Sequence, residues 1–327
     1  MSIKFFDMFA EIGSFRSGLE AIGGFECVGY CKIDKYAKQA YEAMYDTGGE
    51  LYFDDARKIV PEQLPDFDLL VGGFPCQSFS IAGARKGFDD TRGTLFFEIA
   101  RIAAVKKPKY LFLENVPGLL NHDKGRTFET ILRTLDGLGY NVCWQVLNIK
   151  NFGLLIKAKT KDGYQVAYPG DSIDIAFSGQ NSRRGRVGNQ VAHTLTTSAT
   201  QAYYFIDLNP DPKLTEIARC ITARHDSGIS NRKAEHSGVF VESTNIADDE
   251  KFAVAFVEPN GEVHIGRIRK LTPRECWKLQ GFTDDQFDKA KATGLSDSRL
   301  YKMAGNAVTV KVISEIGKII KKVNDKN

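Results

Sequence analysis

Residues 3–22 read IKFFDMFAEIGSFRSGLEAI, and this stretch decides the fold. Ile3–Phe6 is rich in β-branched and aromatic residues and predicts a strand, whereas the apolar spacing of Phe15–Ile22 predicts a helix. In a doubly wound sheet, the turn at the carboxyl end of such a strand is where a nucleotide-like ligand binds. One glycine in such a turn is common, however, so Phe6–Phe15 alone leaves a structural turn and a cofactor turn equally open.

The alternation of strand and helix continues to residue 150. Further strands are expected at Cys27–Tyr30, Leu69–Val71, Tyr110–Leu113 and Cys143–Leu147, and further helices at Lys35–Tyr45, Leu95–Val105 and Phe128–Leu138. This order predicts an α/β fold in which a doubly wound, mostly parallel sheet carries helices on both faces.

The pattern changes after residue 150. Short β-like runs then lie among Gly, Ser, Thr, Asn and Asp, and they occupy Gln165–Tyr168, Ala202–Ile206, Val239–Glu242 and Ala253–Glu258. Helical patterns return after Arg267, first in LTPRECWKLQ, where Thr272 can cap a helix that begins at Pro273, and last in Val308–Val323. We therefore expect one domain made of residues 1–150 and 267–327, with a smaller loop- and β-rich domain, residues 151–266, inserted in it.

Composition excludes several classes of protein. The formal charge of +3 over 327 residues does not by itself indicate a nucleic-acid-binding protein. The six cysteines form no CxxC pair, and apart from Cys27 and Cys31 they are far apart in the sequence, which argues against a metal site or a disulfide framework and fits a reducing cytosol. The start of the sequence has no basic leader before an apolar run, and no stretch approaches the roughly 18 apolar residues of a membrane span. We expect no metal and no membrane contact.

The segment GGFPCQSFS, residues 72–80, contains the first candidate for chemistry. Cys76 follows a proline in a glycine-bounded loop directly after the apolar run Leu69–Val71. An isolated cysteine is more often a buried core residue than a nucleophile. The rigid loop at a strand end favours the nucleophile here.

The segment LFLENVP, residues 111–117, contains the second candidate. Glu114 ends a β-run at the sheet edge, where partial burial would raise its pKa and allow it to deliver a proton. A solvated glutamate at the end of a strand is the equally open alternative for this segment alone.

Five segments together resemble the DNA cytosine C5-methyltransferases, and specifically the single-domain bacterial and phage enzymes. They occur in the order found in that family: DMFAEIGSFRSGLE, GGFPCQSFSIAGARKGFDDTRGTLFFEIARI, KPKYLFLENVPGLL, RKLTPRECWKLQGF and KMAGNAVTVKVI. The resemblance covers residues 1–150 and 267–327. It implies the S-adenosylmethionine-dependent methyltransferase fold, with residues 151–266 as the target-recognition domain.

The resemblance also implies a mechanism. In the family, a cysteine thiolate adds to C6 of a flipped-out cytosine while a glutamate protonates N3, so that C5 can take the methyl group of S-adenosylmethionine. Cys76 is then the nucleophile and Glu114 the acid, Pro75 and Asn115 orient the base, and Arg92 lies beside the pocket. The implied partner is double-stranded DNA, bound by a monomer on the nucleoid of a bacterial or phage-infected cell.

Binding residues follow from the same motif positions. The expected cofactor cradle consists of Phe9, Glu11, Ile12, Gly13, Lys32, Ile33, Asp55, Ala56, Leu95 and Asn306, with Asp55 accepting from the adenine amino group. The expected DNA contacts are Gln77, Ser80, Arg183, Arg184 and Arg186.

Two departures from the family pattern fall in that cradle. Glu11 stands where the family has a glycine that lets the backbone approach the cofactor. Lys32 stands where the family has an acidic residue that accepts from the ribose hydroxyls, and a lysine has donors only. The two side chains can pair, but the pair would occupy cofactor space. The sequence thus predicts weak S-adenosylmethionine binding, which the double change Glu11→Gly, Lys32→Glu would tighten.

A third departure follows Phe152-Gly153. The family continues there with a Gln-x-Arg-x-Arg strand, whereas this chain reads LLIKAKTKDGYQ. The later segment NSRRGRVGNQVAHTLTTS resembles a second basic segment of phage-type relatives, whose arginines either contact phosphates or are solvated surface charges. Two alternatives to an active DNA enzyme stay open: a degenerate homologue without methyl transfer, and an RNA cytosine C5-methyltransferase.

Overall fold

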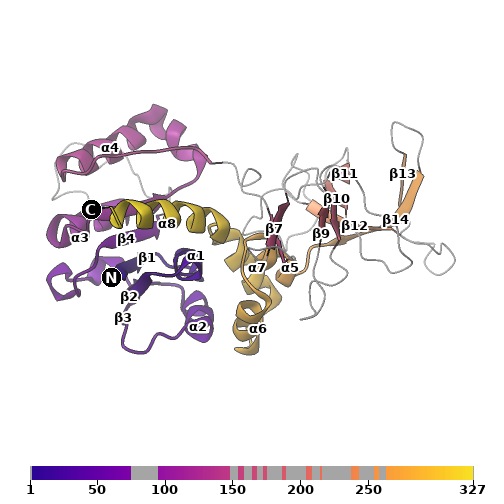
Figure 1. Ribbon diagram of the computed structural model, residues 1–327, viewed down its shortest axis with the longest axis horizontal. Helices are drawn as coiled ribbons and strands as arrows, with labels where there is room; N and C mark the ends of the chain where they lie inside the picture. Colours follow the sequence, from indigo (N-terminus) through magenta and orange to yellow (C-terminus); the bar gives the residue numbers. More distant parts are fainter. Residues whose placement is uncertain are drawn as a thin grey trace. The chain divides into compact units, whose positions relative to one another are not determined.

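The computed structural model describes residues 2–74, 95–147 and 270–326 in full, and between residues 148 and 269 the backbone of the strands alone. The chain divides into two compact units (Figure 1). The first consists of Met1–Val146 and Trp277–Asn327, and the second of Leu147–Cys276.

A five-stranded parallel sheet is the centre of the first unit. Its strands lie in the order β3-β2-β1-β4-β5, with bounds Leu51–Phe53, Phe25–Cys31, Ile3–Met8, Leu69–Gly73 and Tyr110–Glu114. All four pairings are parallel. The chain runs outward in one direction from β1 to β3 and in the other from β4 to β5, so the topological switch point lies between β1 and β4. Ligands of such sheets bind outside the carboxyl ends of the strands at that point.

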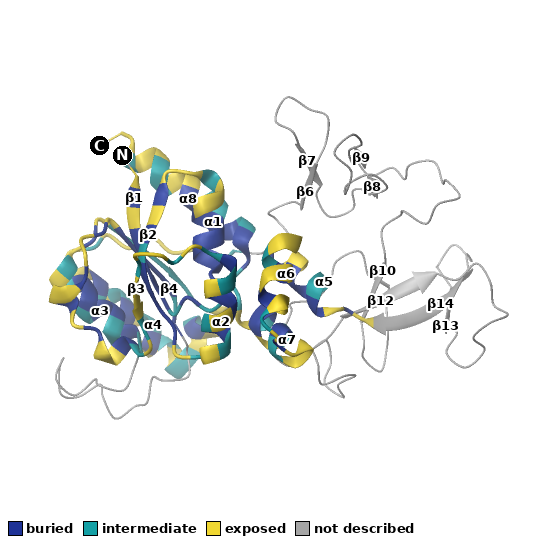
Figure 2. Ribbon diagram, turned by 90° about the horizontal axis from the view of Figure 1, so that it is seen from below, coloured by how far each residue is buried: buried dark blue, intermediate teal, exposed yellow. Residues whose placement is uncertain are grey.

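Helices cover both faces of this sheet, as the sequence predicted. On one face, Phe15 of α1 (Ser14–Ile22) and Ile313 of α8 (Val310–Asn324) pack with Phe5 and Val71. The other face packs Phe6 and Leu70 against α3 (Leu95–Lys106) and α4 (Arg126–Gly137). Figure 2 shows the central strands and the inward sides of the helices mostly as buried, whereas the outer strands β3 and β5 are exposed or intermediate.

The remaining described elements of the first unit are short. They are the helices α2 (Lys35–Met44), α6 (Asp284–Ala292) and α7 (Asp297–Asn306), the 3₁₀ helices η1 (Ala56–Lys58), η2 (Pro61–Gln63) and η6 (Pro117–Gly125), and the end of α5 (Pro273–Leu279). Helical structure thus returns at Pro273, and the last helix begins two residues later than predicted.

The strand predicted at Cys143–Leu147 is wrong. The segment has no regular secondary structure, and Val142, Trp144 and Val146 are exposed. Alternating apolar residues form a strand only where a neighbouring strand accepts their hydrogen bonds. Here Trp144 instead packs edge-on against Phe128 of α4, with ring centroids 5.2 Å apart. The sequence also missed β3, which has only three residues.

The second unit contains antiparallel pairs. One sheet has the order β11-β10-β12-β14-β13, with bounds Leu214–Thr215, Tyr204–Asp207, Ser237–Glu242, Val263–Lys270 and Val254–Val257. Two hairpins pair β6 with β7 and β8 with β9, with bounds Leu154–Lys157, Tyr164–Ala167, Ser172–Asp174 and Arg186–Gly188. All four predicted β-like runs overlap strands of this unit.

The inner strand β1 holds a buried acid, Asp7. Its side chain is fully buried, and neither carboxylate oxygen has a hydrogen-bond partner among the described residues. Burial raises the pKa of Asp7 from 3.8 to about 8, although the nearby Arg16 guanidinium lowers it. At neutral pH the protonated form therefore predominates in the folded protein.

We expect Asp7→Asn to stabilise the fold increasingly as pH rises. Because the folded pKa is raised, the stability associated with protonated Asp7 is complete below pH 4 and is lost as pH rises to about 8. An asparagine side chain cannot ionise, so the variant does not lose stability at this position as pH rises. The difference in melting temperature between variant and unmodified protein should grow between pH 5 and pH 8. In a domain of this size, each kcal/mol of difference in the free energy of unfolding corresponds to roughly 2–4 °C. A difference independent of pH would contradict a raised pKa.

Candidate active site

Three chain segments meet at the switch point of the sheet. Met8 at the end of β1 pairs with Gly72 of β4, and Gly73 pairs with Glu114 at the end of β5. The turn after β1, Phe74 just after β4 and Glu114 at the end of β5 therefore lie at one edge of the sheet. The sequence had placed each of these segments at the end of a strand, and the carboxyl ends of parallel strands lie at the same edge.

Glu114 has the environment of a proton donor. Its side chain is half-buried, and burial raises its pKa. The expectation of partial burial with a raised pKa is thus confirmed. A β-carbon at position 73 would lie 3.0 Å from Glu114 Oε2, so the glycine leaves room for the carboxyl.

Asn115 connects the ends of β4 and β5. Its Nδ2 donates to the carbonyl oxygen of Phe74 at 2.6 Å, and its Oδ1 accepts from the backbone N–H of Val116 at 2.9 Å. Both polar atoms of the amide are thus engaged by backbone. Asn115 fixes the chain one residue before Pro75, and its contact with a base stays a prediction.

The two unusual cradle residues form an ion pair. Lys32 Nζ lies 2.6 Å from Glu11 Oε1, and the Lys32 side chain is only 8% exposed. Asn306 of α7 donates a longer hydrogen bond from Nδ2 to the same oxygen, at 3.4 Å. The pairing that the sequence allowed is thus present in the structure.

The turn that carries Glu11 has a left-handed backbone. Phe9, Glu11 and Gly13 have φ values of 58°, 46° and 81°. A β-carbon at Gly13 would lie 2.5 Å from Cε2 of Tyr45, so the glycine is required by packing as well as by its φ. Tyr45 also donates from its hydroxyl to the Gly13 carbonyl at 2.9 Å. The turn is thus fixed from behind by Tyr45, which follows α2.

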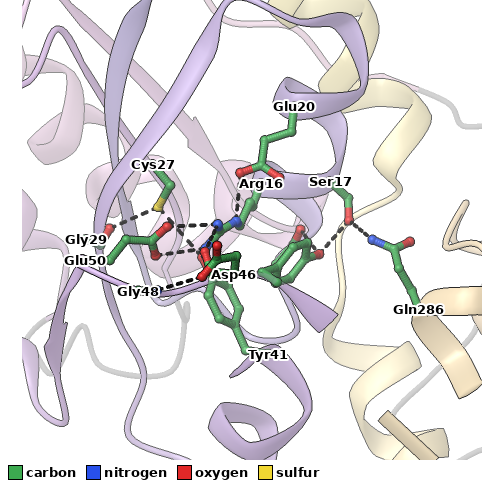
Figure 3. A network of polar contacts seen from close by, with 12 residues as sticks. Arg16, Ser17, Glu20, Cys27, Gly29, Tyr41, Asp46, Gly48, Glu50 and Gln286 are labelled. Carbon is green, nitrogen blue, oxygen red and sulfur yellow. Dashed lines mark hydrogen bonds and ion pairs between the residues drawn. The ribbon is translucent and has the colours of Figure 1, made fainter. Parts of the chain in front are cut away.

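A polar network around Arg16, which the sequence did not predict, lies next to this turn (Figure 3). Buried Arg16 donates to Glu20 and Glu50 and to the carbonyl of Asp46, each at 2.8 Å. The network joins α1 to the loop before β3. The one signal in the sequence was an arginine at a position of α1 that faces the core.

The other cradle residues are differently placed. Ile12 and Ala56 are buried, Leu95 is half-buried at the start of α3, and Ile33 is 69% exposed just past β2. Asp55 caps η1 through the N–H of Arg57, and it also accepts from the Arg57 guanidinium at 2.6 Å. These contacts lower the pKa of Asp55 and keep it charged, but its acceptor oxygens are shared with Arg57.

Several predicted residues lie outside the described part of the chain: Pro75, Cys76, Gln77, Ser80, Arg92, Arg183 and Arg184. Arg186 lies in β9, of which the backbone alone is described. Within the described residues, no group of three or more His, Cys, Asp or Glu side chains could hold a metal ion. None of the described helices is long and apolar enough to cross a membrane.

Comparison with known proteins gives the family. The family model for C-5 cytosine-specific DNA methylases matches residues 3–155 and 176–322. The chain belongs to this family. Like its curated relatives in bacteria and phage, it is a DNA methyltransferase of the C5-cytosine class.

Relatives in bacteria and phage match over almost the whole chain. Type II methyltransferase M.NlaX of Neisseria lactamica is 36% identical, over 97% of this chain and 96% of its own. Type II methyltransferase M.HhaI of Haemophilus parahaemolyticus is 34% identical over 96% and 93%, and the orphan methyltransferase M.SPRI of Bacillus phage SPR is 31% identical over 97% of each.

Solved structures agree on the fold. The Dnmt2 methyltransferase of S. pombe superposes with a TM-score of 0.59 at 16% identity, covering 99% of this chain and all of its own. A putative DNA modification methyltransferase encoded in an E. coli prophage gives 0.55 at 17% identity, covering 99% and 100%. These similarities show the methyltransferase fold, as the sequence predicted.

Proposed function

We propose that this methyltransferase transfers a methyl group from S-adenosylmethionine to C5 of a cytosine flipped out of double-stranded DNA. The observation that carries the proposal is the position of Glu114. This half-buried acid, with its pKa raised by burial, lies at the carboxyl end of β5 beside the strand that leads into Gly72-Gly73-Phe74-Pro75-Cys76. Family membership supports the same assignment.

The proposed steps use Cys76 and Glu114. The Cys76 thiolate forms a bond to C6 of the base while Glu114 gives its proton to N3, and the electrons of the C5–C6 double bond become available at C5. When bound, S-adenosylmethionine supplies an electrophilic methyl group. Once C5 has gained the methyl group and S-adenosylhomocysteine is left, the C5 proton passes to water and the N3 proton returns to the Glu114 carboxylate. The C5–C6 double bond is then restored and the thiolate leaves. A raised pKa favours the protonated Glu114 that the first step needs.

The residues at the carboxyl ends of β1 and β2 fit such a cofactor. The turn of Phe9, Glu11 and Gly13 is held in a left-handed conformation, and Asn306 reaches the turn from α7. Phe9, Ile33 and Asn306 would hold the cofactor, with Ile33 providing an exposed apolar surface for its base. Asp55 would accept a hydrogen bond from the adenine amino group through the lone pairs of its carboxylate that Arg57 does not use.

The second unit is proposed as the target-recognition domain, and duplex DNA as the partner of a monomer. Arg183, Arg184 and Arg186 are the proposed phosphate contacts, together with Gln77 and Ser80 from the Cys76 loop. The relatives from bacteria and phage support action on DNA in a bacterial or phage-infected cell.

A second candidate is a degenerate homologue that does not transfer methyl groups. The Glu11–Lys32 ion pair favours it, because a charged pair in the cofactor turn would weaken binding if it filled the space of the ribose. The RNA cytosine C5-methyltransferase is the remaining alternative from the sequence, and no contact of the described residues favours it over the DNA enzyme.

One acceptor assay separates the three. Purified protein with isotopically labelled S-adenosylmethionine is offered mixed-sequence duplex DNA and, separately, transfer RNA. We expect label in the DNA and none in the RNA. Label in RNA alone would replace the proposed substrate, and label in neither would favour the degenerate homologue.

A further inference from the structure

We propose that Glu11 is the residue that accepts hydrogen bonds from the ribose hydroxyls of the cofactor, and that Lys32 holds it in position. The proposal rests on the proposed function, since it concerns the same cofactor site. It names a recognition residue on β1's turn, where the sequence alone suggested an obstruction.

The place of Glu11 is the first argument. In doubly wound sheets, an acidic side chain near the end of β2 accepts from ribose hydroxyls beside the turn after β1. Here the end of β2 carries Lys32, but the Lys32 ammonium reaches 2.6 Å from Glu11 Oε1. The Glu11 carboxylate therefore contacts the residue that follows β2, although Glu11 itself lies in the turn after the neighbouring strand β1.

The charge balance is the second argument. Lys32 is nearly inaccessible to water, so a charged ammonium there needs a close anion. The fully buried Asp7, whose charge also acts on Lys32, is a poor candidate because its pKa is raised to about 8. Glu11 is the side chain that lies against the ammonium, and the two charges hold each other.

The second carboxylate oxygen of Glu11, Oε2, is available to a ligand. Both described contacts of the carboxylate, from Lys32 and from Asn306, fall on Oε1. Among the described residues no hydrogen bond is made to Oε2. Glu11 is 25% exposed and lines a small pocket with Asp34, Tyr36, Met303 and Asn306. One carboxylate oxygen is thus anchored, and the other is available to a hydroxyl that enters this pocket.

Taken together, the two departures compensate each other. The acceptor has moved from β2 to the turn after β1, and the lysine that took its place anchors it. The expectation of weak cofactor binding is replaced by that of ordinary binding through a different residue.

The test measures dependence on the ribose hydroxyls directly. S-adenosylhomocysteine and its 2′-deoxy and 3′-deoxy counterparts are titrated calorimetrically into the full chain and into Glu11→Gln. A hydrogen bond to a charged acceptor corresponds to about a 10- to 100-fold change in affinity. We expect at least one deoxy ligand to bind the unmodified chain about 10-fold or more weaker than the parent ligand. In Glu11→Gln the parent ligand should weaken by a similar factor, and its advantage over that deoxy ligand should fall to within about 3-fold.

Two further variants complete the design. Glu42→Gln removes a carboxylate that pairs with Lys38 at 2.5 Å but does not line the pocket, and it should bind all ligands like the unmodified chain. The double variant Glu11→Gly, Lys32→Glu restores the family's pattern and should bind the parent ligand within about 3-fold of the unmodified chain.

The outcomes separate this inference from the proposed function. If the unmodified chain and Glu11→Gln prefer the parent ligand equally, or if the double variant binds about 10-fold tighter than the unmodified chain, the acceptor role of Glu11 is overturned and the enzyme assignment stands. If no variant binds S-adenosylhomocysteine and the acceptor assay shows no methylation, both fail.

Discussion

Duplex DNA that carries 5-fluorocytosine is expected to form a denaturant-resistant complex with the unmodified chain, and Cys76→Ala is expected to form none. The thiolate adds to C6 and the methyl group is transferred, but the fluorine at C5 does not leave as a proton does. The final elimination is therefore blocked and the covalent bond persists. The complex should require S-adenosylmethionine and is measured as a shifted band in denaturing electrophoresis.

Cys143 offers a matched control for this experiment. It is a free, exposed cysteine in the segment after α4, so Cys143→Ala makes the same change at an accessible thiol. We expect it to trap DNA as the unmodified chain does. Trapping by Cys76→Ala would show that the nucleophile has been misassigned.

Glu114→Gln is expected to slow the chemical step by about 10²- to 10⁴-fold, the usual contribution of a general acid. An amide cannot deliver a proton to N3. The variant keeps the size of the side chain beside Gly73, so DNA affinity should change little. Single-turnover methyl transfer and a separate DNA-binding titration give the two quantities.

The pH dependence adds a second readout. Protonated Glu114 is the active form, so the rate for the unmodified chain should fall as pH rises through the raised pKa of this group. Glu114→Gln should lack that fall. Glu129→Gln changes an exposed glutamate that pairs with Arg133 on α4, and it serves as the control with unchanged rate. Equal losses of binding and rate in Glu114→Gln would mark the residue as structural.

Most of the sheet could be predicted because each of its longer strands has a recognisable pattern in its own residues. Leu69–Gly73 and Tyr110–Glu114 are compact apolar runs, and their order alternates with helices. Cys143–Leu147 is also rich in apolar residues and is not a strand. A strand also needs a neighbouring strand to pair with, and the local sequence does not show whether one is present. β3 was not predicted, because three residues are too few to show the alternation that indicates a strand.

The site shows the same division. Glu114 and the Glu11–Lys32 pair were predictable, because each follows from a motif position at the carboxyl end of a strand. The contacts of Arg16 with Glu50 and of Tyr45 with Gly13 were not, since they join residues about 30 positions apart through side-chain geometry. The anchoring of only one Glu11 oxygen likewise depends on a contact from distant Asn306.

The most direct test of methyl transfer to DNA cytosine needs no knowledge of the target sequence. The chain is expressed in a bacterial host that lacks cytosine methylation, and the host DNA is digested to nucleosides and analysed by mass spectrometry. The account predicts 5-methyl-2′-deoxycytidine with the unmodified chain and none with Cys76→Ala. If the unmodified chain accumulates as folded protein and the host DNA contains no 5-methyl-2′-deoxycytidine, the proposed activity is contradicted.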